Sequence, residues 1–162
     1  MNTGNRSCGT CTACCDGWVQ MVIHGTSVVP GSPCPHSTGK GCAIYPDRPV
    51  EPCVNFNCGW INKNSPLPGW MHPPKGKCIV LFDKLRWNET PVDLAMPVGV
   101  KIPPRSLEWL KAFAEQHGRP LIYTEQIMQK GQFTNQQKVL GHGSAEFQQS
   151  LVQWLQKGRK LW

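Results

Sequence analysis

The chain has 162 residues with nine cysteines, 16 glycines, 15 prolines and a formal net charge of +7, and 40% of its residues are hydrophobic. This length favours one domain, or one domain with a closely packed extension, but the apolar content is low for an ordinary core. No apolar run reaches the 18 residues of a membrane helix and no charged-then-apolar leader is present, so we expect no membrane span, no secretory signal and a cytoplasmic location.

The N-terminal half is rich in turn-forming residues. Residues 1–7 are predicted to form a short flexible arm ahead of the first cysteine. Residues 18–23 read as a strand, because Val19, Met21 and Ile23 alternate onto one face. Residues 34–64 are predicted to be loops and turns, punctuated by glycine and proline.

Regular structure is expected to begin at Cys78. Residues 78–82 form a continuous apolar run, typical of a strand buried on both sides, and residues 91–104 read as irregular. A helix is predicted over 106–114 and a strand over 121–124. Ser144 is the expected N-cap of a last amphipathic helix.

These elements predict an α+β protein. We expect a small, irregular, metal-stabilised and cysteine-rich fold with short strands, packed against a few C-terminal helices. We expect the chain to form two regions, a cysteine-cluster metal-binding region at residues 1–77 and an α+β region at residues 78–162, packed together as one domain.

Eight of the nine cysteines fall in the first 58 residues. The first four are spaced C-x2-C-x2-C-C, and two further pairs come later in the chain. The complete set is Cys8, Cys11, Cys14, Cys15, Cys34, Cys42, Cys53 and Cys58. Thiols separated by two residues share a tight turn and can reach one ion at about 2.3 Å. An odd total and a reducing location favour metal binding over disulfides, so all eight are predicted metal ligands.

The spacing leaves the division of these thiols between centres open. Three thiols at successive x2 steps are typical of an iron–sulfur loop, and Cys34-Pro35 has the form of a fourth ligand. Cys15 points elsewhere and would join Cys42, Cys53 and Cys58 in a second centre, although eight sulfurs admit other divisions. His36 is a reserve ligand. The ninth cysteine, Cys78, is predicted to be a small buried core residue.

Residues 8–58 resemble the YkgJ-like cysteine-cluster family, whose members are described as zinc- or iron-chelating CxxCxxCC domains. The resemblance rests on the eight cysteines, on Tyr45 with Arg48-Pro49, and on the closing Cys53-x2-Phe56-x-Cys58. It implies metal binding with an unassigned biological role. Flagellin lysine N-methylases are similar in carrying such a cluster, thought there to be iron–sulfur. Tyr45 and Arg48 are predicted to orient the ligand loop, the alternative being simple packing and a surface charge.

Three functions are therefore carried forward. The first is a metal-binding protein that chelates zinc or iron through thiolates, and the second is an enzyme whose [4Fe-4S] cluster supports redox or group-transfer chemistry. The third is a basic nucleic-acid-binding module. Its support is weak, because the basic residues are spread along the chain and two tetrathiolate zinc centres would lower the net charge to about +3.

Overall fold

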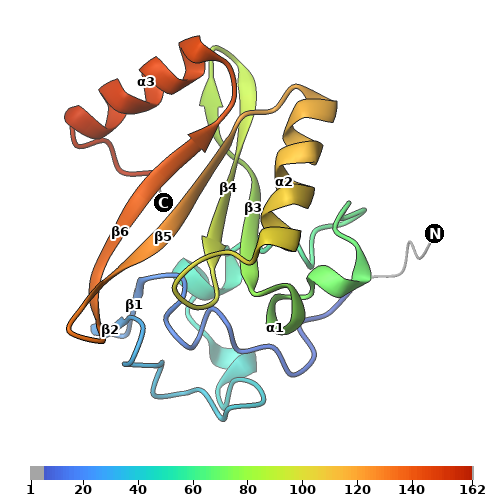
Figure 1. Cartoon of the computed structure of the whole chain (residues 1–162). Helices are drawn as coiled ribbons and strands as arrows, with labels where there is room; N and C mark the ends of the chain where they lie inside the picture. The colour runs from blue at the N-terminus through green and yellow to red at the C-terminus, as the bar shows by residue number, and fades with distance from the viewer. Residues whose placement is uncertain (1–5, 162) are drawn as a thin grey trace.

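The computed structural model describes residues 6–161, so most of the predicted N-terminal arm lies outside the described residues. Figure 1 shows a sheet with helices on it and an irregular N-terminal region beneath. The short elements of that region are β1 (Met21–Ile23), β2 (Thr26–Val28), η1 (Tyr45–Asp47), η2 (Val50–Val54), η3 (Gly69–Met71) and α1 (Pro73–Gly76). The longer elements are β3 (Cys78–Trp87), β4 (Thr90–Pro97), α2 (Pro104–His117), β5 (Leu121–Gln129), β6 (Gln132–His142) and α3 (Ala145–Gln156).

The longer strands form one four-stranded sheet in the order β3-β4-β5-β6. β3 and β4 are antiparallel, β4 and β5 are parallel, and β5 and β6 are antiparallel. The parallel pair requires a crossover, which α2 supplies between β4 and β5. The predicted α+β class is confirmed. Within the described part of the chain, no helix combines the length and the apolar character needed to cross a bilayer.

Both faces of this sheet are covered, which is why β3 begins with a continuous apolar run. Ile79 and Leu81 face a core that includes α3 and the first cysteine segment. Cys78 and Val80 point to the opposite face, where α2 and the segment around Met71 cover them. The cysteine region is therefore one wall of the main core rather than a separate lobe.

Two contacts tie the N-terminal region to the far end of the β5–β6 hairpin. The Trp18 ring meets the Phe133 ring edge-on, with centroids 5.4 Å apart. The Gln20 side-chain amide donates a hydrogen bond of 3.0 Å to the backbone carbonyl of Asn135. The hairpin tip is thus anchored on the residues that directly follow the C-x2-C-x2-C-C segment.

A close backbone approach joins the last clustered cysteine to the sheet. Gly59 N–H donates a hydrogen bond of 2.6 Å to the Val80 carbonyl. A Cβ on Gly59 would lie 2.7 Å from that same oxygen and 2.8 Å from the Phe82 ring, so only glycine fits. Cys58 is held against β3 as a result.

Several predicted elements need correction. The strand expected at 18–23 is limited to Met21–Ile23 and pairs with β2. The segment 91–104, predicted to be irregular, contains β4 instead, because its prolines stand at the strand ends. The predicted helix N-cap is confirmed, since the Ser144 hydroxyl accepts a hydrogen bond of 3.1 Å from Phe147 N–H.

Candidate metal centre

Most of the clustered cysteines line one cavity of about 210 Å³ between the N-terminal region and β3. The chain segments that supply them are as far apart in sequence as Cys8 and Cys58, and Ile79 of β3 also lies in the wall. The cysteines that line the cavity are Cys8, Cys11, Cys14, Cys15, Cys42, Cys53 and Cys58. Seven of the eight predicted ligands are therefore brought together by the fold.

Tight turns explain how the first four thiols gather. Cys11 N–H donates to the Cys8 carbonyl at 2.9 Å, which places these two side chains on one turn. The Thr12 hydroxyl donates to the Asp16 carboxylate at 3.0 Å and closes the next turn. Gly17 then reverses the chain with a φ of +94°, a conformation that other residues rarely adopt.

Cys34, the eighth predicted ligand, lies beside the cavity rather than in its wall. Its side chain is buried together with Ile23 and Val28. Cys15 and Cys53 pack against this small cluster, and Cys34 N–H donates to the Cys15 carbonyl at 2.7 Å. Cys34 is therefore a direct neighbour of two thiols that do line the cavity.

The environment of the thiols differs from one cysteine to the next. Burial raises the pKa of the Cys8 and Cys11 thiols above the usual value, and raises that of Cys58 to about 11. A hydrogen bond between the two side chains keeps the proton on Cys14, whose pKa is raised, and lowers the pKa of Cys15 to about 7. Burial therefore favours the neutral form of the Cys8, Cys11 and Cys58 thiols.

Arg48 supplies positive charge at this cavity. It lies in the wall together with Tyr45 and lowers the pKa of Cys8 and Cys53, partly offsetting the effect of burial. Its guanidinium carbon sits 3.9 Å from the centre of the Tyr45 ring, and its NH1 donates to the Tyr45 carbonyl at 2.7 Å. These contacts hold Arg48 and Tyr45 together beside the thiols, and the Tyr45 side chain is mainly exposed.

Two residues that the sequence patterns did not single out hold the first ligand turn. The Trp60 indole N–H donates to the Ser7 carbonyl at 3.1 Å, and His72 Nε2 lies 3.2 Å from the Cys8 carbonyl oxygen. The Trp60 and His72 rings pack on each other with centroids 4.6 Å apart. The position of Trp60 two residues after Cys58 was the only local signal for this role.

The other candidate ligands lie elsewhere. His36 is not among the residues that line the cavity, and its ring meets His24 edge-on at 5.7 Å. Cys78 is 1% exposed in the core on the opposite face of the sheet. The prediction that Cys78 is a core residue is confirmed.

The thiols do not yet form a closed coordination shell. Among the described residues 6–161, no group of three or more Cys, His, Asp or Glu side chains is placed tightly enough to hold a metal ion. Each cysteine at positions 8–58 is a free thiol. Binding would require these side chains to turn toward a common ion, and the cavity gives them the space to do so.

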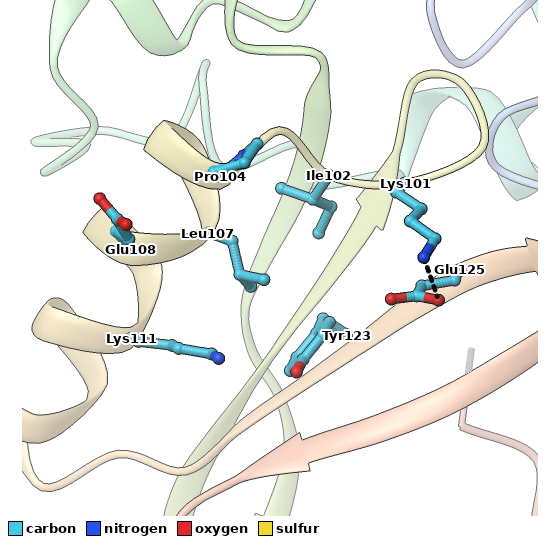
Figure 2. A pocket seen from close by; sticks show the side chains of 8 residues that line it. All are labelled: Lys101, Ile102, Pro104, Leu107, Glu108, Lys111, Tyr123 and Glu125. Carbon is cyan, nitrogen blue, oxygen red and sulfur yellow. Dashed lines mark ion pairs between the residues drawn. The ribbon is translucent and has the colours of Figure 1, made fainter.

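A second cavity of about 290 Å³ lies between the start of α2 and β5 (Figure 2). The Lys101 ammonium pairs with the Glu125 carboxylate at 3.6 Å at its rim. The Lys111 ammonium lies 5.6 Å from the centre of the Tyr123 ring. Its two lysines and two glutamates balance in charge, and its wall contains no cysteine, histidine or methionine that could bind a soft metal. The thiol cavity is the stronger candidate.

Comparison with known proteins adds no further assignment. The chain matches no family model, no curated protein and no solved structure.

Proposed function

We propose that this protein binds a thiophilic transition metal, zinc or iron, through the cysteines of residues 8–58, as the resemblance to YkgJ-like proteins implies. One observation supports this most directly. Seven cysteines from separate chain segments line a single cavity. Chance burial of cysteine as a small hydrophobe would scatter these side chains through the core, as it does Cys78.

The chemistry of the cavity also fits a cation. A soft metal ion can take the place of the protons of several thiols in one pocket, the protons being released to solvent, and the resulting thiolates lose their mutual repulsion once they share a positive ion. Such thiols must stay reduced to bind metal, which is consistent with a cytoplasmic protein.

A zinc ion and an iron–sulfur cluster would have different roles in this protein. A tetrathiolate zinc site would be structural, and would replace the apolar core that the Gly- and Pro-rich segment lacks. An iron–sulfur cluster would supply electrons to redox or group-transfer chemistry. Arg48 beside Cys8 and Cys53 suits either case, because a positive neighbour stabilises the net negative charge of a thiolate-bound metal.

Metal analysis of protein purified anaerobically without added metal tests the proposal. We expect firmly bound zinc or iron, with the thiols of residues 8–58 protected from thiol reagents in the folded protein and all nine thiols titrating after unfolding with a chelator. Less than about half an equivalent of any transition metal per chain, together with paired disulfides, would contradict metal binding. A brown protein with broad visible absorbance would identify iron–sulfur, and a colourless protein that carries only zinc would exclude the enzyme alternative that needs it.

A further inference from the structure

We infer that the eight clustered cysteines form two separate four-thiolate centres, one made of Cys8, Cys11, Cys14 and Cys58 and the other of Cys15, Cys34, Cys42 and Cys53. This inference rests on the proposed function and adds the number of centres and the ligands of each. Relative to the division favoured by spacing, Cys34 and Cys58 change places.

Packing separates six of the eight thiols into two groups of three. Cys11, Cys14 and Cys58 pack against the main core, beside Ala13 and Ile79. Three thiols of the other set belong to a different, smaller apolar cluster. Cys34 is buried in that cluster, and Cys15 and Cys53 pack against it. The adjacent residues Cys14 and Cys15 thus pack against different clusters, while their side chains remain in contact with each other.

The neighbouring thiols of Cys58 and Cys53 follow the same division, while Cys15 also lies near Cys8, Cys11 and Cys14. Cys58 is influenced by Cys8 and Cys11, which belong to its own set. Cys53 is influenced by Cys15, Cys34 and Cys42, the other three members of the second set. Each of the two last cysteines in the cluster therefore lies next to the thiols that would complete its centre.

Backbone hydrogen bonds hold members of each set close together. In the first set, Cys11 N–H binds the Cys8 carbonyl at 2.9 Å. In the second, Cys34 N–H binds the Cys15 carbonyl at 2.7 Å, and the Ser37–Cys42 bridge folds Cys42 back toward Cys34. The link in the first set joins residues three apart, whereas the link in the second set joins Cys15 to Cys34 across a long loop. Cysteine spacing alone therefore did not reveal the second link.

Four thiolates are the complete ligand set of a structural zinc ion and also of a [4Fe-4S] cluster. Eight thiols in two sets of four leave no ligand unused. The Cys14–Cys15 side-chain contact shows that the two sets are neighbours, so one larger centre with bridging sulfurs is the competing arrangement that the experiment must distinguish.

Cadmium reconstitution of the full chain tests the division directly. The metal-free protein is titrated with ¹¹³Cd²⁺, and through-bond ¹H–¹¹³Cd correlations identify the cysteines bound to each ion. We expect two cadmium resonances, one correlated with Cys8, Cys11, Cys14 and Cys58 and the other with Cys15, Cys34, Cys42 and Cys53. A cysteine correlated with both ions, or Cys34 and Cys58 exchanged between them, would overturn the inference. A protein that takes up no cadmium, zinc or iron would instead contradict the proposed function.

Paired substitutions provide a second measurement on zinc-loaded protein. Cys11→Ser with Cys58→Ser removes two ligands of one set, so one of two ions should remain, and Cys34→Ser with Cys53→Ser should behave in the same way. Cys11→Ser with Cys34→Ser damages both sets and should remove both ions. Retention of one ion by this mixed pair, or loss of both ions in either matched pair, would count against two separate centres. The matched pairs are the control for the mixed pair, because each of the three variants removes the same number of thiols.

Discussion

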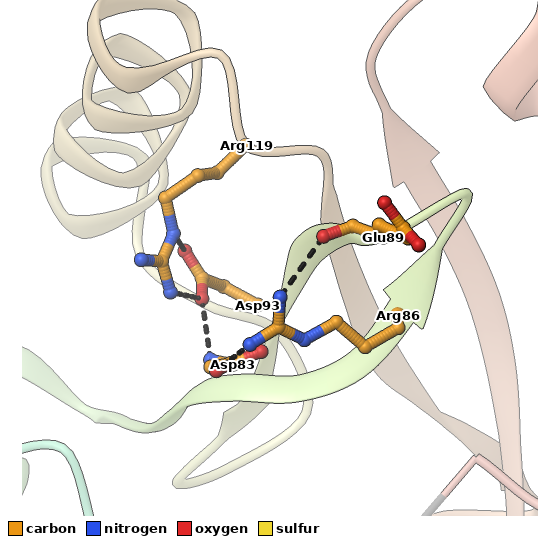
Figure 3. A network of polar contacts seen from close by, with 5 residues as sticks. All are labelled: Asp83, Arg86, Glu89, Asp93 and Arg119. Atoms are coloured by element: carbon orange, nitrogen blue, oxygen red, sulfur yellow. Dashed lines mark hydrogen bonds and ion pairs between the residues drawn. The ribbon is translucent and has the colours of Figure 1, made fainter.

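The Arg119 guanidinium donates two hydrogen bonds to the Asp93 carboxylate, one from Nε at 3.1 Å and one from NH2 (Figure 3). Asp93 is 3% exposed in β4, and its carboxylate also accepts the backbone N–H of Asp83 at 2.8 Å. One side chain therefore joins β4 to the irregular point of β3 and to the loop before β5.

Arg119→Ala should lower the free energy of unfolding by about 3–5 kcal/mol, because it leaves the buried Asp93 carboxylate without its charged partner. The matched control is Arg86→Ala, which breaks an exposed ion pair with Asp83 and should cost no more than about 1 kcal/mol. Denaturant unfolding of both variants measures the difference. Equal costs would show that Asp93 is solvated.

Metal removal should loosen the cysteine region before the sheet. Without the ion, residues 8–58 are held mainly by turns, whereas β3–β6 keep the core on the α2 face. Hydrogen exchange after chelation should show protection lost across 8–58 and largely retained in the sheet, with a lower melting temperature. Unchanged exchange in 8–58 would mean that metal does not stabilise this region.

Arg48→Gln should weaken metal affinity by roughly 10- to 100-fold, as expected when a group that supports the ligands is removed. The charge of Arg48 acts on both Cys8 and Cys53, so its loss leaves the thiolates less compensated. Competition with a chromophoric chelator gives the affinity. Arg86→Gln, a surface arginine on β3, is the charge-matched control and should leave affinity unchanged.

Cys78 should make the protein sensitive to strongly alkaline pH. Burial raises its pKa from 9.0 to about 12, so the unfolded chain loses this proton first as the pH rises. The stabilisation from the neutral buried thiol is complete below pH 9 and is lost as the pH approaches 12. Melting temperatures of metal-free wild type and Cys78→Ala should therefore converge above pH 9. Parallel curves would contradict a protonated Cys78.

Gly59→Ala should destabilise the protein by about 1–3 kcal/mol, because the new methyl group would overlap the Val80 carbonyl. Gly69→Ala is the control, since a Cβ there meets no atom within 4 Å, and it should change stability by no more than about 0.5 kcal/mol. Thermal unfolding compares the two. A neutral Gly59→Ala would show that β3 can move away from Cys58.

Sequence patterns identified the elements whose signals are local. The apolar run at Cys78 and the cap at Ser144 both depend on residues within one turn or strand, and both predictions are confirmed. β6 was not predicted, because Gln132–His142 is largely polar and has no clear alternation. It forms because Lys130 and Gly131 turn with positive φ and return the chain along β5.

The candidate site shows the same limit. Cysteine spacing indicated which thiols gather, since tight turns bring x2 pairs together whatever the rest of the chain does. It did not indicate that Cys34 lies behind the cavity or that His72 holds the Cys8 turn. Both depend on packing between segments far apart in sequence, for which no local pattern exists.

The edge-on contact of Trp18 with Phe133 connects the cysteine segment to the tip of the β5–β6 hairpin. Trp18 follows Cys14 and Cys15 by only a few residues, so any movement of those thiols toward an ion pulls on the same short stretch of backbone. The Gln20 side chain adds a hydrogen bond to Asn135, so the same stretch that follows Cys15 also fixes where the β5–β6 hairpin tip lies.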